Sequence, residues 1–195
     1  MKRLVLLVLV VFVSCGATAQ EQMRRNYMEI VVLDEDGYTM FVGSGVFLNK
    51  NTAVSVAHLF PGESESVSLD IELDLAYIRL PEKKKGIRVR WGEANVGDTV
   101  LVFGNGYGLN GVLTSHIVSK KTDEYVFIYP AVLMGTSGAG VYNTEGQLVG
   151  IVKAIWKNDV PGDRASLGIY IPAKVVKEFI REKRKENKTP PNPQK

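Results

Sequence analysis

Short apolar segments rich in valine and isoleucine follow one another from Tyr27 to Ile171, and glycines and polar turns separate them. Segments such as "TVLVFGNG", "EYVFIYPAV" and "GQLVGIVKAI" show no helical periodicity of useful length. Repeated strands of this kind are typical of β-sandwiches and β-barrels. The sequence therefore predicts an all-β fold, with "DEDG" at 34–37 and "NTEG" at 143–146 as hairpin turns.

The segment "EANVGDTV" separates an early from a late group of strands, and we place the division near Gly97. One amphipathic helix is predicted at about 172–187, with an apolar stripe formed by Val175, Val176, Phe179 and Ile180. Its basic end, from Lys183 to Lys188, is interpreted as a solvated helix terminus that complements the helix dipole, and weak attraction to an anionic surface is the alternative. The proline-rich residues 189–195 predict a disordered tail.

Residues 1–19 predict a secretory signal peptide. They carry two cations, an apolar run from Leu4 to Val13, and the small residues "ATA" before Gln20. The apolar run is too short to span a bilayer comfortably. We expect cleavage after Ala19 and export to the periplasm or the medium. The alternative is lipoprotein processing at Cys15, which would anchor the protein to a membrane.

The cysteine count excludes a disulfide-stabilised protein, and the net charge does not favour a nucleic-acid-binding one. Cys15 is the only cysteine, so a chain cut after Ala19 contains no disulfide and must be held together by its core. The formal charge of +3 falls to +1 once the two signal-peptide cations are removed. A nearly neutral chain does not indicate a nucleic-acid partner, and no stable membrane span is expected after signal removal. The sequence does not indicate an oligomeric state.

Residues 134–143, "MGTSGAGVYN", place one hydroxyl, that of Ser137, among small residues between two apolar runs. One interpretation is a hairpin turn, since glycine adopts backbone angles that other residues avoid. The other is a loop shaped to hold an oxyanion, with Ser137 as a nucleophile. The short motif alone favours the turn, so the rest of the chain must decide.

The chain has only two histidines, which narrows the search for a catalytic base. His58 ends the strand pattern "TAVSVAH" and is the candidate, with a structural role as the alternative, whereas His116 is assigned to the fold. Asp74 interrupts the apolar pattern of "DLAYIRL" and is expected to be partly buried and paired. An imidazole N–H is a suitable donor for it, and Asp70 is the competing acid.

The strand-end "AH", the later "DLA" and the late "GTSGAG" followed by "GQLVGI" resemble, in this order, the trypsin-like serine peptidases of the chymotrypsin fold. The closest likeness is to the compact bacterial branch that includes the HtrA proteases, without a PDZ domain. The resemblance covers Val42 to about Pro172. It implies a peptidase domain over 20–188 that consists of two antiparallel β-barrels, at about 27–96 and 97–172, with a C-terminal α-helix.

The resemblance also implies the roles of individual residues. His58 would be the general base, Asp74 its orienting acid and Ser137 the nucleophile, while the backbone N–H groups of Gly135 and Ser137 would form the oxyanion hole. Such a peptidase acts on proteins or peptides and requires no metal ion or organic cofactor. The small residues at 138–140 are expected to keep the approach to Ser137 open.

The same resemblance places the substrate pocket before and after the serine loop. Its floor is expected at Ala131 and Val132, and its walls at Lys153, Ala154, Ile155 and Gly168. Because no acid stands at the floor, basic substrate side chains should be poor and small or medium aliphatic ones preferred. Lys153 reaching inward would favour an acidic side chain instead.

The chain departs from the family's pattern at several points. Thr136 replaces the acidic or amide residue often found before the serine, Ala139 and Gly140 replace the usual glycine and proline or serine, and the interval from His58 to Asp74 is short. The altered loop supports a second hypothesis, a peptidase-fold protein that binds peptides or a partner without turnover. A third hypothesis is a purely structural secreted β-protein.

Overall fold

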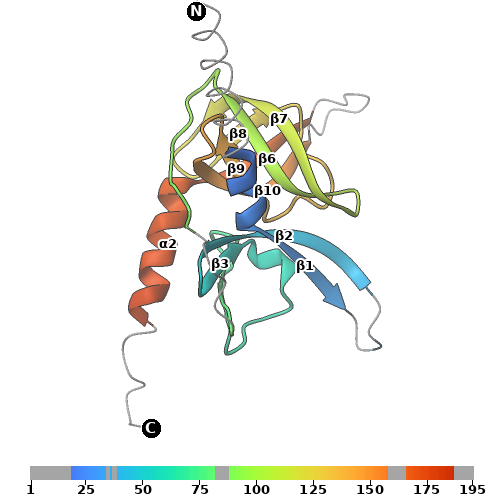
Figure 1. Ribbon diagram of the computed structural model, residues 1–195, viewed down its shortest axis with the longest axis vertical. Coiled ribbons are helices and arrows are strands. Elements are labelled where there is room, and N and C mark those ends of the chain that lie inside the picture. Colours follow the sequence, from blue (N-terminus) through green and yellow to red (C-terminus); the bar gives the residue numbers. More distant parts are fainter. Residues whose placement is uncertain (1–18, 34–35, 37–38, 82–87, 158–165, 187–195) are drawn as a thin grey trace, which may run out of the picture.

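The computed structural model describes residues 19–33, 36, 39–81, 88–157 and 166–186. The tail at 189–195, nearly all of the predicted signal peptide and most of the "DEDG" turn lie outside these residues. The chain forms two β-structures stacked on one another, with β6–β10 in one and β1–β3 in the other (Figure 1).

The first half is a five-stranded antiparallel sheet with the order β1-β2-β3-β5-β4. Its strands are β1 (Tyr27–Leu33), β2 (Thr39–Asn49), β3 (Thr52–Ser55), β4 (Val67–Asp70) and β5 (Leu75–Arg79). The part of "GIRVRW" that the structure describes makes only isolated bridges, from Arg88 to Asn49 and from Trp91 to Leu148. In the described chain, this half is therefore an open sheet.

The second half is a closed six-stranded barrel with the order β10-β11-β8-β7-β6-β9. Its strands are β6 (Thr99–Gly106), β7 (Leu109–Lys121), β8 (Val126–Tyr129), β9 (Gly140–Asn143), β10 (Leu148–Lys157) and β11 (Ser166–Pro172). The predicted "NTEG" turn is confirmed between β9 and β10, where the Gly146 amide donates to the Asn143 carbonyl at 3.0 Å. The expected all-β fold with a second-half barrel and a C-terminal helix is confirmed, whereas the first of the two predicted barrels is an open sheet in the described residues, because the part of 88–98 that follows β5 makes isolated bridges and no strand.

Two apolar cores stabilise this arrangement. One fills the barrel and is built largely from valines of β6, β7, β8, β9 and β10, all nearly inaccessible to solvent. The other joins the first sheet, the barrel and the C-terminal helix, and includes Val54, Leu75, Phe103 and Phe179. Full burial of such side chains contributes about 1.5–3 kcal/mol each, so the second core holds the two halves together.

The C-terminal helix α2 (Ala173–Glu186) lies along one side of both halves (Figure 1). Its predicted stripe is confirmed, because Val176, Phe179 and Ile180 are buried and Val175 packs against the same core. The helix contacts β10 and β11 of the barrel and also β5 of the first sheet. None of the described helices is long and apolar enough to cross a membrane.

Residues 19–26 form a second helical segment that the sequence did not predict. Met23 of this segment is 1% exposed, and its side chain packs in the core shared by the two halves. The segment is about two turns long and places one apolar side chain in that core. A single buried residue produces no apolar repeat in the sequence, whereas α2 has one.

Candidate active site

His58 lies just beyond β3, in the one-turn 3-10 helix η1 (Ala57–Leu59), and not at the strand end that the sequence suggested. The Ala57 amide donates to the Asp74 carbonyl at 3.2 Å, which ties this turn to the start of β5. The histidine side chain is 45% exposed, so its ring is accessible to solvent.

Asp74 precedes β5 in the turn that follows β4, so it does not interrupt a strand as its apolar neighbours implied. Its φ of 58° is in the left-handed region, which aspartate and asparagine adopt more readily than other non-glycine residues. Its carboxylate accepts the His58 amide at 3.0 Å through Oδ1. Only 14% of this side chain is exposed, in agreement with the expected partial burial.

The His58 ring contacts the same carboxylate. Its Nδ1 lies 2.9 Å from Asp74 Oδ2 and 3.1 Å from Oδ1. A carboxylate only accepts hydrogen bonds, so Nδ1 carries the proton and Nε2 of the neutral ring carries the lone pair. The competing acid, Asp70, instead accepts the Leu73 amide at 2.9 Å and caps the β4–β5 turn.

His116 is only 2% exposed and belongs to the barrel. Its Nδ1 lies 2.7 Å from the Pro130 carbonyl, and its Nε2 lies 2.7 Å from the Thr114 hydroxyl. Burial lowers the pKa of this imidazole below its ordinary value, although the Pro130 carbonyl acts in the opposite direction. These contacts fit the structural role expected for His116.

The loop before Ser137 begins with a tight turn in which the Thr136 amide donates to the Leu133 carbonyl at 3.3 Å. Gly135 has a φ of 91° in this turn, a conformation that favours glycine. The Met134 carbonyl accepts the Tyr107 amide at 2.8 Å. Because the C=O and N–H of a trans peptide point in opposite directions, this contact directs the Gly135 N–H away from Tyr107.

Among residues 135–138, two amides remain free of acceptors within the described chain, those of Gly135 and Ser137. The amides that alternate with them are occupied, since Thr136 donates to Leu133 and Gly138 donates to the Val152 carbonyl at 2.9 Å. The backbone thus offers two unused donors next to the Ser137 hydroxyl. A hydrogen bond between His58 and Ser137 is absent from the described structure.

Thr136 anchors the loop in place of the acidic or amide residue often found there. Its hydroxyl donates to the Leu133 carbonyl at 2.6 Å, beside the bond made by its own amide. The residue is 3% exposed. The amide and the hydroxyl of Thr136 therefore both bind the Leu133 carbonyl and stabilise the turn.

The small residues at 138–140 serve close packing, which corrects the expectation that they keep the approach to Ser137 open. All three are buried. A Cβ at Gly138 would overlap the Ser44 carbonyl and the Ser55 hydroxyl, and Gly138 also has a φ of 80°. The backbone of β2 can approach the serine loop only because position 138 has no side chain.

A buried polar network joins the two halves behind the serine loop, and the sequence analysis did not find it. The Ser44 amide donates to the Ser137 carbonyl at 2.8 Å, and the Ser44 hydroxyl accepts the Asn105 amide at 2.8 Å. The Tyr27 hydroxyl donates to Asn105 Oδ1 at 2.6 Å, and burial raises the pKa of Tyr27 to about 12. The glycines around Ser44 in "GSG" were the only sequence signal of this close approach.

A pocket of about 280 Å³ opens beside Ser137. Of the predicted pocket residues, Val132, Ala154 and Ile155 line it. The remaining described lining is formed by Leu133, Met134, Gly135, Thr136, Ser137, Val152 and Lys157. The structure thus brings Ser137, both residues with free amides and an apolar pocket together.

Three predicted pocket residues, Ala131, Lys153 and Gly168, do not line this pocket. The Lys153 ammonium donates to the Tyr125 hydroxyl at 3.0 Å and lies 4.6 Å from the centre of that ring. Lys153 lies between two pocket residues, Val152 and Ala154, at a β-bulge of β10 against β11, so its side chain leaves the strand on the other face. Gly168 lies behind Val132, which a Cβ there would contact.

Comparison with known proteins identifies the kind of domain in which this site lies. Residues 60–151 match the family model described as a trypsin-like peptidase domain, a stretch that includes both Asp74 and Ser137. This stretch of the chain resembles a trypsin-like peptidase domain. The resemblance stated from the sequence is therefore confirmed for the domain.

Two bacterial proteins are similar to this chain. The chain is 29% identical over 161 residues to a probable periplasmic DegP-like serine endoprotease of Rhizobium meliloti, a match that covers 77% of the chain and 29% of the relative. A protein of the same description from Brucella suis is 29% identical over 162 residues, with 77% and 28% covered. The chain thus matches less than a third of the length of these relatives.

A solved structure supports the same fold. The serine endoprotease from Yersinia pestis matches the chain with a TM-score of 0.69 and 20% sequence identity. The match covers 84% of this chain and 65% of that one. At this identity the likeness concerns the fold.

Proposed function

We propose that this protein is an exported serine endopeptidase that hydrolyses peptide bonds through Ser137, His58 and Asp74. The observation that carries the proposal is the pair of unused amides at Gly135 and Ser137 beside a serine hydroxyl and an apolar pocket. The contact between His58 Nδ1 and Asp74 supports it, because this contact leaves Nε2 to act as a base. The DegP-like relatives are named periplasmic serine endoproteases.

In the proposed mechanism, Ser137 Oγ attacks the carbonyl carbon of the substrate while His58 Nε2 takes the hydroxyl proton. The carbonyl oxygen becomes an oxyanion and accepts hydrogen bonds from the amides of Gly135 and Ser137. His58 then protonates the leaving amine, and the acyl-enzyme remains. Water, deprotonated by His58, attacks the acyl-enzyme, and the ester bond to Ser137 then breaks as His58 returns the proton to Ser137 Oγ, which releases the second product as a carboxylic acid.

The two amides would supply the largest single contribution to the rate. Each preorganised donor at an oxyanion stabilises the transition state by about 3–4 kcal/mol. The contact between Tyr107 and Met134 fixes one of these donors before substrate arrives. Catalytic hydrogen bonds are often long without substrate and tighten in the complex, as we expect for His58 and Ser137.

A labelled fluorophosphonate tests the proposal directly, because an activated serine displaces its fluoride and becomes phosphonylated, whereas ordinary serines do not react. We expect covalent labelling at Ser137, identified by peptide mass spectrometry, and no labelling of the Ser137→Ala variant. The Ser119→Ala variant, which alters an exposed serine elsewhere, should label like the parent protein. A folded parent protein that takes up no label would contradict the proposal and favour a binding module without turnover.

The pocket predicts which side chain is preferred just before the scissile bond. Its described lining is apolar apart from Thr136, Ser137 and Lys157, and contains no carboxylate. Arginine or lysine would therefore lie unpaired there, and we expect cleavage after them to be at least about 100-fold poorer than after valine, alanine or leucine. Profiling against a peptide library measures this preference.

Two results of that profiling would contradict the aliphatic preference. Strong cleavage after arginine or lysine would mean that the pocket beside Ser137 does not receive this side chain. Strong cleavage after glutamate would assign the selectivity to a cation, and Lys157 replaces Lys153 as that cation because Lys153 is bound to Tyr125. The Lys157→Gln variant would then lose the preference for glutamate.

Export predicts the N-terminus of the mature protein. Cleavage after Ala19 leaves the helical segment 19–26 almost whole and keeps Met23 in the core. We therefore expect intact-mass and N-terminal analysis of the exported protein to give a chain that begins at Gln20. A lipid-modified Cys15 at the N-terminus would refute this prediction and would make the protein membrane-anchored.

A further inference from the structure

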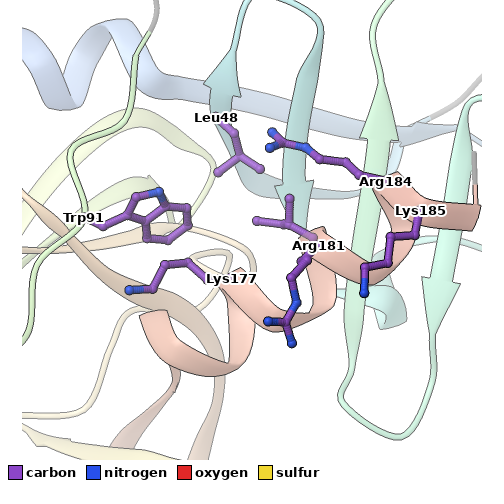
Figure 2. A pocket seen from close by; sticks show the side chains of 7 residues that line it. Leu48, Trp91, Lys177, Arg181, Arg184 and Lys185 are labelled. Atoms are coloured by element: carbon purple, nitrogen blue, oxygen red, sulfur yellow. The ribbon is translucent and has the colours of Figure 1, made fainter. Parts of the chain in front are cut away.

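A second pocket, of about 330 Å³, lies where α2 meets β2 and the segment before β6. It is lined by Leu48, Trp91 and Ile180 together with four cations of α2, Lys177, Arg181, Arg184 and Lys185. Figure 2 shows Trp91 and Lys177 on one side and Arg184 extending from the helix toward Leu48. It shares no lining residue with the pocket beside Ser137, so it is a separate site.

The floor of this pocket is apolar. Leu48 is 7% exposed and Ile180 is 5% exposed, and both belong to the core that joins the two halves. Trp91 packs partly buried against the same core. A volume at the lower end of the range for ligand pockets, about 300–1,000 Å³, suits one aliphatic or aromatic side chain of a ligand.

The rim of the pocket is cationic because four basic side chains of α2 lie on the side that faces the pocket and the acidic ones lie on another side. Lys177, Arg181, Arg184 and Lys185 recur at helical spacing and lie on one side of the helix. The acids Glu178, Glu182 and Glu186 recur on another side, and Glu186 pairs with Lys183 at 3.1 Å. Within the described chain, no carboxylate forms an ion pair with Lys177, Arg181 or Arg184.

The stability of α2 does not explain this arrangement. Lys177, Arg181 and Lys185 follow one another at intervals of four residues, and like charges at this spacing destabilise a helix. The helix dipole favours cations only within the last turn, and Lys177 and Arg181 lie before it. Lys177 lies 5.9 Å from the centre of the Trp91 ring, and Arg181 and Arg184 form no ion pair within the described chain, so these charges can bind a partner of opposite sign.

We propose that this pocket binds an acidic segment of a second polypeptide, with one apolar side chain on the floor and flanking carboxylates on the cations. The cationic row from Lys177 to Lys185 is about 12 Å long, the length of roughly three to four residues of an extended chain. The pocket is concave with a small apolar floor, which fits a protruding side chain better than the flat surface of a bilayer. Binding requires no turnover, so the site goes beyond the proposed peptidase activity and does not depend on it.

Trp91 provides the readout for a direct test. The chain has two tryptophans, and Trp156→Phe leaves Trp91 as the only one. In a protein that also carries Ser137→Ala, to prevent cleavage, we would titrate the peptide Asp-Glu-Leu-Glu-Asp and record tryptophan fluorescence. We expect a saturable change, and at least about a fivefold higher Kd for Asp-Glu-Ser-Glu-Asp, which lacks the apolar side chain.

Charge variants complete the test. Arg181→Gln with Arg184→Gln should raise the Kd for the leucine peptide about tenfold or more, with an unchanged thermal unfolding midpoint. The matched control, Lys50→Gln with Lys120→Gln, removes the same charge from exposed lysines outside the pocket and should leave the Kd unchanged. The proposal is overturned by an absent or unsaturable response, by equal binding of the two peptides, or by equal loss in the control. Stronger binding to phosphatidylglycerol vesicles or to a sulfated polysaccharide than to the leucine peptide would also overturn it.

Discussion

Replacement of Ser137 with alanine is expected to lower kcat/KM for peptide hydrolysis by about four or more orders of magnitude. The proposed reaction needs the Ser137 hydroxyl to form the acyl-enzyme, and no neighbouring hydroxyl can take its place, because that of Thr136 is bound to the Leu133 carbonyl. Residual hydrolysis would come only from binding and from the two free amides. Initial rates on the best peptide of the library measure the loss.

The same substitution should leave the fold unchanged. Ser137 is held through its backbone, whose carbonyl accepts the Ser44 amide at 2.8 Å, and alanine keeps this bond. The thermal unfolding midpoint of Ser137→Ala should therefore match that of the Ser119→Ala control. Retained peptidase activity in a folded Ser137→Ala protein would refute the assignment of the nucleophile.

The sequence was sufficient for the fold class and for the helix α2. Valine-rich segments between glycine turns correspond to the strands of the barrel, and the stripe of α2 is buried as expected. Periodicity detects such elements because burial repeats with the geometry of a strand or a helix. The helical segment 19–26 was missed because Met23 is its only buried apolar side chain, and one such residue gives no helical periodicity.

The sequence also placed the acid that contacts His58, but not its local structure. The apolar neighbours of Asp74 indicated burial, and this distinguished it from Asp70. These neighbours did not show where β5 begins, because the apolar pattern continues through the turn that contains Asp74, whose φ is positive. The position of His58 in η1 was missed for the same reason, since η1 has no pattern of its own.

The pocket was the least predictable part of the site because it depends on register. Lys153 lies at the β-bulge of β10 and contacts Tyr125, whereas its neighbours Val152 and Ala154 line the pocket. The network of Ser44, Asn105 and Tyr27 was equally hidden, since its members are far apart in the chain. Contacts between distant segments follow from the fold and not from local spacing.

Substitution of Asp74 with asparagine is expected to lower kcat/KM by about four orders of magnitude, close to the effect of removing the nucleophile. The carboxylate accepts from His58 Nδ1 at 2.9 Å and from the His58 amide at 3.0 Å. An asparagine could keep the bond to the His58 amide through its oxygen, but its NH₂ group would then face Nδ1. Nδ1 would accept that hydrogen, so the proton of the neutral ring would move to Nε2, which could no longer act as the base.

Asparagine is the most informative substitution at this position because it removes the charge and keeps the backbone conformation. Asp74 has a φ of 58°, and asparagine adopts this conformation readily, whereas alanine would add strain. The matched control is Asp70→Asn, whose side-chain oxygen can still accept the Leu73 amide and which does not contact His58. We expect the control to stay within a few-fold of the parent protein, with similar unfolding midpoints for both variants. An equal loss in the two variants, or a larger one at Asp70, would show that Asp74 is not the carboxylate that orients His58.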